Sequence, residues 1–325
     1  MKCTIQNIAD HLGLSRNTVS KALKNSSEVS ENTRNLVIKT ASKLGYKNAT
    51  FATPVIPASE TGSNGTILFL TRTYASDSEF WTTVLRGIES ILSNANYHLA
   101  ISIMSDSDLK QLNFPQTISD SSIKGIILVE ICDKVVCDAL SQFNLPIVSV
   151  DMPNVPFEEL NGIDVVTMES KKNLKKIINQ LIEKGAESFG FVGDLYSPNV
   201  SRGFQERYNA LSECLAEHQL PLNQKNCLLH QTPEDFRNFQ TTVNNLQAMI
   251  SLPDVFICGN DWTAIQLIYA LQFLGFQIPK DICVVGFDNI PAASRISPSL
   301  TTISTPQKYL GIAAARQILE RIQHP

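Results

Sequence analysis

Residues 5–23 constrain the fold most, because their apolar side chains recur at the three- and four-residue spacing of two short helices. Gly13 lies between the two stretches as a turn residue, and Ser15 is a suitable N-cap for the second one. Ser30 is placed to cap a third helix. The predicted common core of the three helices consists of Ile5, Ile8, Val19, Leu23, Val37 and Leu44. Two short helices joined by a glycine turn outline a helix-turn-helix.

The charge of this segment differs from that of the rest of the chain. Residues 1–50 contain eight Lys or Arg and three Asp or Glu, whereas the whole chain contains 27 and 31. A basic segment on an otherwise acidic protein indicates a polyanionic partner for that segment alone. Periodicity by itself fits any three-helix bundle, but the charge favours contact with a phosphate backbone.

The exposed face of the second predicted helix carries side chains that suit the edges of DNA bases. They are Arg16, Asn17, Ser20 and Lys21. Arg and Lys match the acceptors of guanine, and Asn matches adenine. We therefore interpret the first three helices as a DNA-binding headpiece.

Residues 4–46 resemble, without a gap, the DNA-binding domain of the lactose/galactose repressor family. The matching motifs are A-x-x-x-G-[LV]-S-x-x-T-V-S-[RK] and, downstream, V-S-x-x-T-R. The resemblance implies that Arg16, Asn17 and Lys21 read bases in the major groove. Hydroxyls and backbone amides then position the headpiece on phosphates. The remaining residues of the predicted DNA-binding set are Thr4, Ser15, Ser20, Ser30, Thr33 and Tyr46.

The segment 48–64 loses periodicity and is rich in Pro, Ser, Thr and Gly, so we expect a linker. In the resembling family this linker holds a short hinge helix whose leucine wedges into the minor groove. Here Val55 stands in the place of that leucine, between Pro54 and Pro57. Proline inside a helix costs about 3 kcal/mol, which opposes a continued hinge helix. Either Phe51 or Val55 replaces the wedge, or the protein bends DNA less than its relatives do.

Beyond the linker, apolar strand-like runs alternate with amphipathic helical stretches, which is typical of parallel sheets covered by helices. About 260 residues favour two lobes over one sheet. The predicted fold class is therefore α/β, with a small all-α headpiece before a two-lobed core of parallel sheets flanked by helices. The predicted domains are 1–47 for DNA binding, 48–64 for the linker or hinge, and 65–325 for effector binding and dimerisation. Within the core we expect lobe one at about 65–158 and 290–318 and lobe two at about 162–288.

Four motifs in the second half of the chain resemble the effector core of the same family, which is similar to sugar-binding periplasmic proteins. They are GND at 259–261, VVGFDN at 284–289, SPSLTTI at 297–303 and LG-x-x-AA at 310–315. Their order and spacing together carry the resemblance. It implies a periplasmic-binding-protein-like fold with a ligand between the lobes.

In open α/β sheets ligands bind beyond the carboxyl ends of the strands, so polar residues that follow the strands are candidates for the site. Carboxylates, Arg and Asn suit a polyhydroxy ligand, and aromatic rings suit its C–H faces. The resemblance adds that Arg207, Asn260 and Asp288 hold the effector. The predicted effector-binding residues are Tyr74, Phe80, Trp81, Asp151, Arg207, Asn260 and Asp288.

Structural roles other than effector binding remain open for some of these positions. Asp261 suits an N-cap as well as a ligand contact, and Phe80 and Trp81 suit core packing as well as sugar stacking. Arg202, a second arginine near Arg207, faces either the cleft or solvent.

Little in the sequence supports an enzyme. The five histidines are scattered without metal-ligand spacing, and no phosphate-binding loop, dinucleotide fingerprint or nucleophile elbow occurs. We therefore predict no catalytic residue, no cofactor and no metal. Seven cysteines without a CxxC pair indicate reduced thiols. With no apolar signal-peptide core and no stretch of transmembrane length, we expect a cytoplasmic protein without a membrane partner.

The sequence thus predicts a ligand-responsive, sequence-specific transcriptional regulator, most simply a repressor. Its expected partners are double-stranded operator DNA, a small effector that is a sugar or sugar derivative, and a second copy of the chain. Two alternatives stay open. One is a sugar-binding protein without a regulatory role, and the other is an activator or corepressor-dependent regulator with a nucleoside or sugar-phosphate effector.

Overall fold

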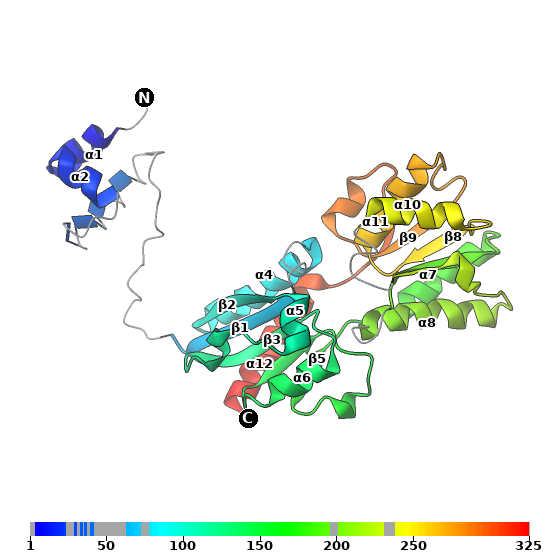
Figure 1. Cartoon of the computed structure of the whole chain (residues 1–325), viewed down its shortest axis with the longest axis horizontal. Helices are drawn as coiled ribbons and strands as arrows, with labels where there is room; N and C mark the ends of the chain where they lie inside the picture. Colours follow the sequence, from blue (N-terminus) through cyan, green and yellow to red (C-terminus); the bar gives the residue numbers. More distant parts are fainter. Residues whose placement is uncertain are drawn as a thin grey trace. The chain divides into compact units, whose positions relative to one another are not determined.

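The structure of the chain is a computed structural model that separates into two compact units, Met1–Gly62 and Ser63–Pro325. Figure 1 follows the chain from the blue N-terminus to the red C-terminus. The described residues are 4–23, 29–30, 33–34, 36–37, 40–41, 63–72, 78–195, 201–230 and 238–324. The predicted linker and hinge, including Pro54 and Pro57, therefore lie almost entirely outside the described residues.

The first unit contains the predicted helix-turn-helix, formed by α1 (Ile5–Leu12) and α2 (Arg16–Leu23). Gly13 ends α1 with φ 63°, a left-handed backbone that glycine adopts without strain. The Ser15 hydroxyl accepts a hydrogen bond from the Thr18 amide at 3.1 Å, as expected of an N-cap. The buried core is Ile8, Ala9, Val19, Ala22, Val29, Val37 and Ala41. These small apolar side chains let short helices pack closely, and the predicted Leu44 lies outside the described residues.

The second unit contains two five-stranded sheets in which all the pairs are parallel. In order across the first sheet, the strands are β2 (Tyr97–Met104), β1 (Gly65–Arg72), β3 (Ile123–Val129), β4 (Ile147–Val150) and β5 (Ile163–Val166). Across the second they are β10 (Thr301–Ser304), β9 (Cys283–Asp288), β8 (Val255–Cys258), β6 (Phe189–Asp194) and β7 (Leu228–His230). The central strands are almost wholly apolar because helices cover both faces of a parallel sheet.

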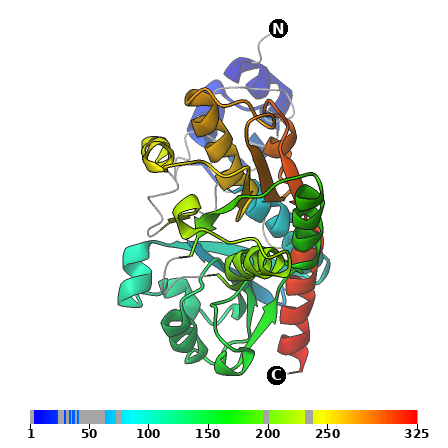
Figure 2. The same ribbon diagram turned by 90° about the vertical axis from the view of Figure 1, so that its right-hand side faces the viewer.

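Helices flank both sheets, as the sequence predicts. On the first they are α4 (Glu79–Asn94), α5 (Asp106–Gln111), α6 (Lys134–Ser141) and α12 (Gln307–Gln323). On the second they are α7 (Lys172–Glu183), α8 (Arg202–Glu217), α10 (Phe239–Ala248) and α11 (Asp261–Phe273). Single turns of 3-10 helix complete the described elements: η2 (Gln116–Ser119), η3 (Phe157–Glu159), η4 (Gln224–Asn226) and η5 (Pro291–Ser294). Figure 2 shows α12 in red at the first sheet, although it follows the last strand of the second. No described helix is long and apolar enough to cross a membrane.

The two sheets divide the chain elsewhere than at the predicted lobe boundaries. β5, which we placed in lobe two, pairs with β4 of the first sheet, and β10, which we placed in lobe one, pairs with β9 of the second. Each is an edge strand whose backbone forms hydrogen bonds with the strand that precedes it in the chain. The chain therefore passes to the other lobe one strand later than the polar motifs suggest. The chain passes between the lobes after Val166 and again after Ser304.

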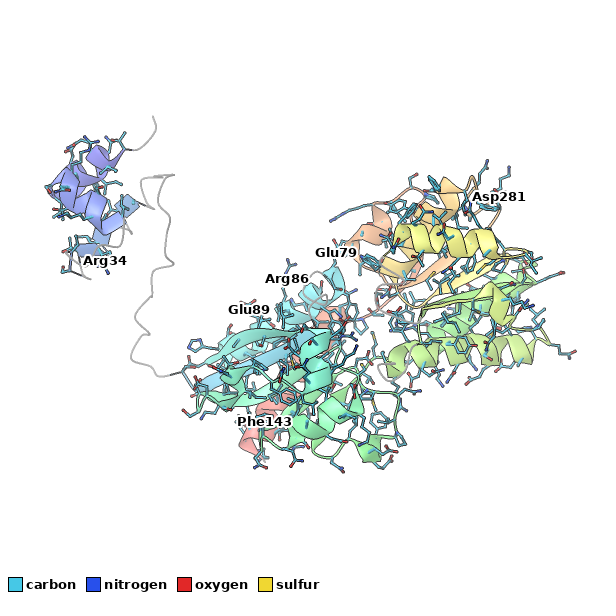
Figure 3. The ribbon with its side chains drawn as sticks, viewed as in Figure 1. Arg34, Glu79, Arg86, Glu89, Phe143 and Asp281 are labelled. Atoms are coloured by element: carbon cyan, nitrogen blue, oxygen red, sulfur yellow. The ribbon has the colours of Figure 1, made fainter. Side chains whose placement is uncertain are left out.

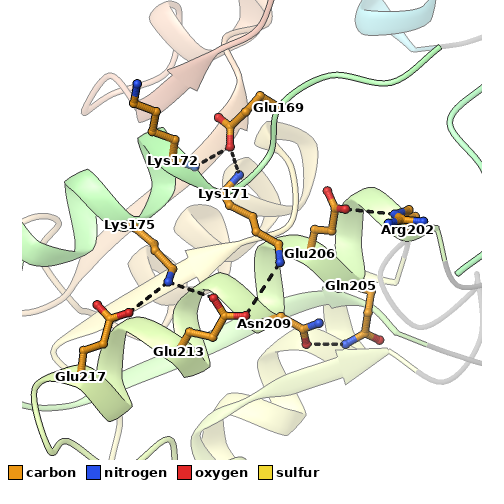
Figure 4. A network of polar contacts seen from close by, with 10 residues as sticks. All are labelled: Glu169, Lys171, Lys172, Lys175, Arg202, Gln205, Glu206, Asn209, Glu213 and Glu217. Atoms are coloured by element: carbon orange, nitrogen blue, oxygen red, sulfur yellow. Dashed lines mark hydrogen bonds and ion pairs between the residues drawn. The ribbon is translucent and has the colours of Figure 1, made fainter. Parts of the chain in front are cut away.

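Two sets of polar contacts join elements of this unit. On α7 and α8, Lys175 contacts Glu213 at 2.9 Å and Glu217 at 3.2 Å, as Figure 4 shows. These pairs are at least a quarter exposed, so each contributes little to stability. Between the lobes, the Glu79 carboxylate at the start of α4 accepts a hydrogen bond from the Ala292 amide of η5 at 3.0 Å. Figure 3 marks Glu79 at this junction.

The contact of α4 with α12 leads to a first prediction. A Cβ on Gly311 of α12 would lie 2.0 Å from the backbone oxygen of Val84 in α4, and one on Gly87 would lie 2.3 Å from that of Lys308. Because backbone atoms cannot move aside, we expect Gly311→Ala to lower the free energy of unfolding by about 3 kcal/mol, the upper end of overpacking costs. Denaturant titration of the core measures this change.

The control is Ala313→Val on the exposed side of the same helix, which should cost less than about 1 kcal/mol. Equal stability of Gly311→Ala and the wild type would mean that the two helices do not approach this closely.

Candidate DNA-binding and effector sites

The α2 surface presents the side chains predicted to read bases. Arg16 and Asn17 are exposed, while Ser20 and Lys21 are half-buried. Val19 and Ala22 are buried against the headpiece core and fix the rotation of the helix. A helix with an apolar inner face and an outer face of this kind fits the major groove. Base contact by these four residues remains a prediction.

The hydroxyls predicted to contact phosphates serve as helix caps in the structure. Thr4 forms a capping box with Asn7 at the start of α1, and Ser15 caps α2. Ser30 accepts a hydrogen bond from the Thr33 amide at 3.3 Å, and their two hydroxyls lie 2.8 Å apart. Capped helix starts still point amides and hydroxyls outward, which suits phosphate. Tyr46 lies outside the described residues.

Three carboxylates lie at the carboxyl ends of strands in both sheets, and we call them the acidic cluster. Glu130 directly follows β3, Asp151 directly follows β4, and Asp288 ends β9. Their backbones have φ of 55°, 77° and 120°, a region that residues with a Cβ rarely adopt. Such strain concentrates at functional sites. Glu130 and Asp151 of the first sheet both raise the pKa of Asp288 of the second, so the ends of the two sheets face one another.

Arg207 of α8 enters this cluster from the second lobe. Its side chain is 4% exposed, its Nη1 donates to the Gly259 carbonyl at 2.6 Å, and its guanidinium lies 3.9 Å from the centre of the Phe287 ring. Burial lowers the pKa of Arg207, and the neighbouring Asp288 and Asp151 oppose that shift. The structure therefore brings together Arg207, Asp151 and Asp288 from the predicted set.

Asp151 also links the two lobes. Its Oδ2 accepts from the Ser201 hydroxyl at 2.5 Å, and Ser201 is the N-cap of α8. Its Oδ1 accepts from the Met152 amide at 2.8 Å. Burial raises the pKa of Asp151, and these hydrogen bonds oppose the shift.

Phe80 and Trp81 of α4 both pack in the apolar core, and Trp81 also contacts the acidic cluster. Both are buried in the main apolar core, and their rings meet edge to face with centroids 4.7 Å apart. The indole Nε1 of Trp81 donates a hydrogen bond to Oε1 of Glu130. Core packing, which the sequence left open, therefore applies to both rings, and Trp81 also orients a carboxylate of the cluster. The third aromatic candidate, Tyr74, lies outside the described residues.

Glu130 is the residue that sequence reasoning missed. It is absent from the predicted site residues, although an acidic residue directly after an apolar parallel strand is the signal that could have identified it. Burial raises its pKa to about 7, while the Trp81 hydrogen bond and Arg72 act in the other direction. Arg72 lies 2.7 Å from Asp106, so its charge is already matched within the first lobe.

At the start of α11, the N-cap role that we considered for Asp261 belongs to Asn260. Asn260, predicted as a ligand contact, is the N-cap, and its Oδ1 accepts from the Thr263 amide at 2.9 Å. Asp261 is fully buried and accepts from the Ile290 amide at 2.8 Å and from the Thr302 hydroxyl. Asp261 thus braces β10 against the segment after β9. The amide nitrogen of Asn260 is its remaining group for a ligand.

Arg202 lies outside the acidic cluster. It pairs with Glu206 at 3.1 Å (Figure 4), stacks over the Phe157 ring at 4.4 Å and donates to the Val155 carbonyl at 3.3 Å. Its role is to hold α8 against the first lobe.

A surface hollow of about 460 Å³ lies at the amino ends of β8 and β9 in the second sheet, the opposite end from the acidic cluster. Its lining includes Ile250, Pro253, Leu274, Phe276 and Asp281. These residues precede β8 and β9 or end their helices, so the hollow is far from the carboxyl ends of the strands. Its carboxylates Asp254 and Asp281 already accept hydrogen bonds from the Ser188 and Gln277 amides, whereas the acidic cluster has unused buried acceptors, so we place the effector site at the cluster.

Comparison with known proteins gives the family. Residues 4–48 match the model of bacterial regulatory proteins of the lacI family, and residues 178–325 match that of a periplasmic binding protein-like domain. Both halves of the predicted architecture are therefore present in one chain. The chain combines a DNA-binding domain of the lacI family with a periplasmic binding protein-like domain.

Relatives in this family match nearly the whole chain. The ribose operon repressor of Haemophilus influenzae is 27% identical over 326 residues, which cover 99% of this chain and 92% of that protein. Catabolite control protein A of Staphylococcus xylosus is 27% identical over 97% of this chain and 91% of its own length. The chain is accordingly a transcriptional regulator.

Solved structures confirm the fold. The regulator CelR in complex with cellobiose has a TM-score of 0.68 at 18% identity, covering 99% of this chain and 94% of that one. The lac repressor dimer bound to operator and the anti-inducer ONPF has a TM-score of 0.65 at 20% identity, covering 99% and 93%.

The acidic cluster makes the stability of the second unit depend on pH. Burial raises the pKa of Asp288 to about 8 and that of Glu130 to about 7, so the folded protein binds more protons than the unfolded chain at neutral pH. The stabilisation that the two protonated carboxyls give the folded protein is complete below the ordinary carboxyl pKa. It is lost as the pH rises through the raised pKa values of Glu130 and Asp288. We expect the free energy of unfolding to fall between pH 5 and pH 8, by at most about 1.4 kcal/mol per pH unit for each group.

Denaturant titrations at pH 5, 6, 7 and 8 test this. Glu130→Gln should give a flatter profile than the wild type, and the exposed Glu89→Gln should not. Parallel profiles for wild type and Glu130→Gln would contradict the raised pKa.

Proposed function

We propose that this regulator is a repressor that binds operator DNA as a homodimer and whose operator affinity changes when a carbohydrate binds at the acidic cluster. One observation carries the proposal, namely the full-length similarity to a ribose operon repressor. Two neighbours in fold point the same way. One is the CelR–cellobiose complex, and the other is a LacI family regulator from Enterococcus faecium with bound ribose, 24% identical with a TM-score of 0.63 over 80% of this chain and 91% of that one.

The proposed division of labour follows the predicted domains. Residues 1–47 bind DNA, 48–64 connect, and 65–325 bind the effector and dimerise, with the lobe boundaries moved to those of the two sheets. The lac repressor was solved as a dimer on its operator, which supports two headpieces on one pseudo-palindromic site. A DNA-binding regulator of this kind works in the cytoplasm.

The acidic cluster and its neighbours offer the chemistry that a sugar requires. Arg207 supplies planar donors, Asp151 and Asp288 supply acceptors, and Asn260 supplies a neutral amide. Trp81 brings an aromatic ring to the edge of the same group. Nothing in this set forms a nucleophile with a base, so we propose that the effector is bound and released unchanged, and that the protein is not an enzyme.

Effector and operator are coupled through the contacts between lobes. The Ser201–Asp151 and Glu79–Ala292 hydrogen bonds join the second lobe to the first. A ligand that contacts both lobes stabilises one relative arrangement of them. The difference in its binding free energy between the two arrangements limits the coupling free energy, which is typically about 1–3 kcal/mol.

The test uses the full-length protein and DNA from upstream of its own gene. Footprinting locates the operator, and fluorescence anisotropy measures its affinity with and without neutral, amino and phosphorylated sugars. We expect one sugar class to shift operator affinity by about fivefold or more. A decrease identifies an inducer and an increase a corepressor. Operator binding that no sugar changes, or equal affinity for operator and random DNA, would contradict the proposal.

A further inference from the structure

The acidic cluster contains more negative than positive charge. Two guanidinium groups face the three carboxyls: Arg207 acts on Asp288 and Asp151, and Arg72, which also pairs with Asp106, acts on Glu130. A fourth acidic side chain, Asp194 at the end of β6, adds to the negative potential at Glu130. A neutral or anionic molecule would leave this excess uncompensated.

Two acceptor atoms of the cluster have no donor among the described residues. They are Oε2 of Glu130 and Oδ1 of Asp288, both buried from solvent. Asp288 is only 7% exposed, and the indole of Trp81 already holds the other oxygen of Glu130. A buried acceptor without a donor costs free energy, more so when it is charged, so both atoms favour a bound donor. Nε of Arg207 is likewise a buried donor without an acceptor in the described part, and it suits a hydroxyl oxygen.

We propose that the effector is a polyhydroxylated amine of monosaccharide size whose protonated nitrogen lies between Glu130 and Asp288, with its hydroxyls on Arg207 and Asp151. This inference rests on the proposed function, because it specifies the ligand of the same site. Glu130 is then the residue that selects an ammonium group over a hydroxyl. An ammonium carries three donors and no acceptor, which matches two carboxylates better than a hydroxyl does.

The ionisation of the cluster distinguishes this ligand from a neutral sugar. Arg72, Asp151 and Asp194 act on Glu130, Glu130 in turn acts on Asp288, and burial raises the pKa of Glu130 to about 7. A cation placed against Glu130 and Asp288 favours their ionised forms, so binding of the amine releases protons. A neutral sugar adds no charge that would favour ionisation of either carboxyl, so its binding leaves their protonation unchanged.

The experiment is calorimetric titration of the full-length protein at pH 7 with matched sugar pairs. The probes are glucose and glucosamine, galactose and galactosamine, and mannose and mannosamine, with glucuronate and glucose 6-phosphate as anions. Repetition in buffers of different ionisation enthalpy counts the protons. We expect at least one amine to bind about tenfold or more tightly than its neutral counterpart and to release about one proton.

In Glu130→Gln the amine should lose about tenfold in affinity while its neutral counterpart changes by less than about threefold. The exposed Glu89→Gln serves as the matched control and should change neither. A neutral or anionic sugar that binds best, without proton release, would overturn this inference and leave the carbohydrate regulator in place. If no probe binds to protein that still binds its operator, both this inference and the carbohydrate effector fail.

Discussion

Arg207→Ala should abolish most effector binding, with a loss on the order of 2–5 kcal/mol in binding free energy, while operator affinity without effector stays unchanged. The reason is the position of the guanidinium, which is 4% exposed and lies within reach of Asp288 and Asp151. Removing one member of such a desolvated group leaves the others uncompensated. A repressor with this change would hold its operator and ignore the effector.

Arg207 also contacts the Gly259 carbonyl and the Phe287 ring, so the experiment has to separate binding from folding. Arg207→Lys keeps the charge but loses the planar fork, and we expect it to bind the effector nearly as poorly as Arg207→Ala does. Arg202→Ala is the matched control on the same helix, since Arg202 pairs with Glu206 instead.

Calorimetric titration gives the effector affinity of each variant, and thermal melting reports its stability. A lower melting temperature with undiminished affinity in both Arg207 variants would show that Arg207 only supports the second lobe. In that case the effector site would have to lie elsewhere.

The alternation of apolar runs and amphipathic stretches predicted the order of the strands and long helices, because burial on both faces leaves so clear a pattern. The short helix α5 escaped prediction. It has six residues, and its start depends on a capping box between Ser105 and Asp108 rather than on a stripe of apolar side chains. The assignment of β5 and β10 to sheets escaped as well, because pairing between edge strands depends on tertiary contacts that periodicity does not encode.

In the effector site, the family resemblance led to Arg207 and Asp288, and the position after a strand led to Asp151; the structure brings the three together. The motifs could not separate Asn260 from Asp261, because either residue can cap a helix and only the packing shows that Asp261 reaches Thr302. Glu130 has no motif of its own. It became visible when the fold placed it beside Trp81 and within the electrostatic influence of Asp151.

The DNA-binding face offers the second large effect. Arg16 is exposed at the first position of α2, where a recognition helix contacts base edges. A bidentate arginine–guanine contact contributes about 1–3 kcal/mol, and a dimer makes it twice, so we expect Arg16→Ala to weaken operator binding by about 2–6 kcal/mol. The specificity should relax at one base position in each half-site.

Arg16→Lys distinguishes base reading from charge, because lysine keeps the positive charge and loses the paired donors. If Arg16 reads a base, Arg16→Lys loses affinity for the operator but keeps affinity for random DNA and the same dependence on salt. If Arg16 contacts phosphate alone, Arg16→Lys resembles the wild type, and Arg16→Ala weakens operator and random DNA equally. Anisotropy titrations of both variants on both DNAs, across a series of salt concentrations, decide between the two. Equal losses on operator and random DNA would remove Arg16 from the residues that give this regulator its specificity.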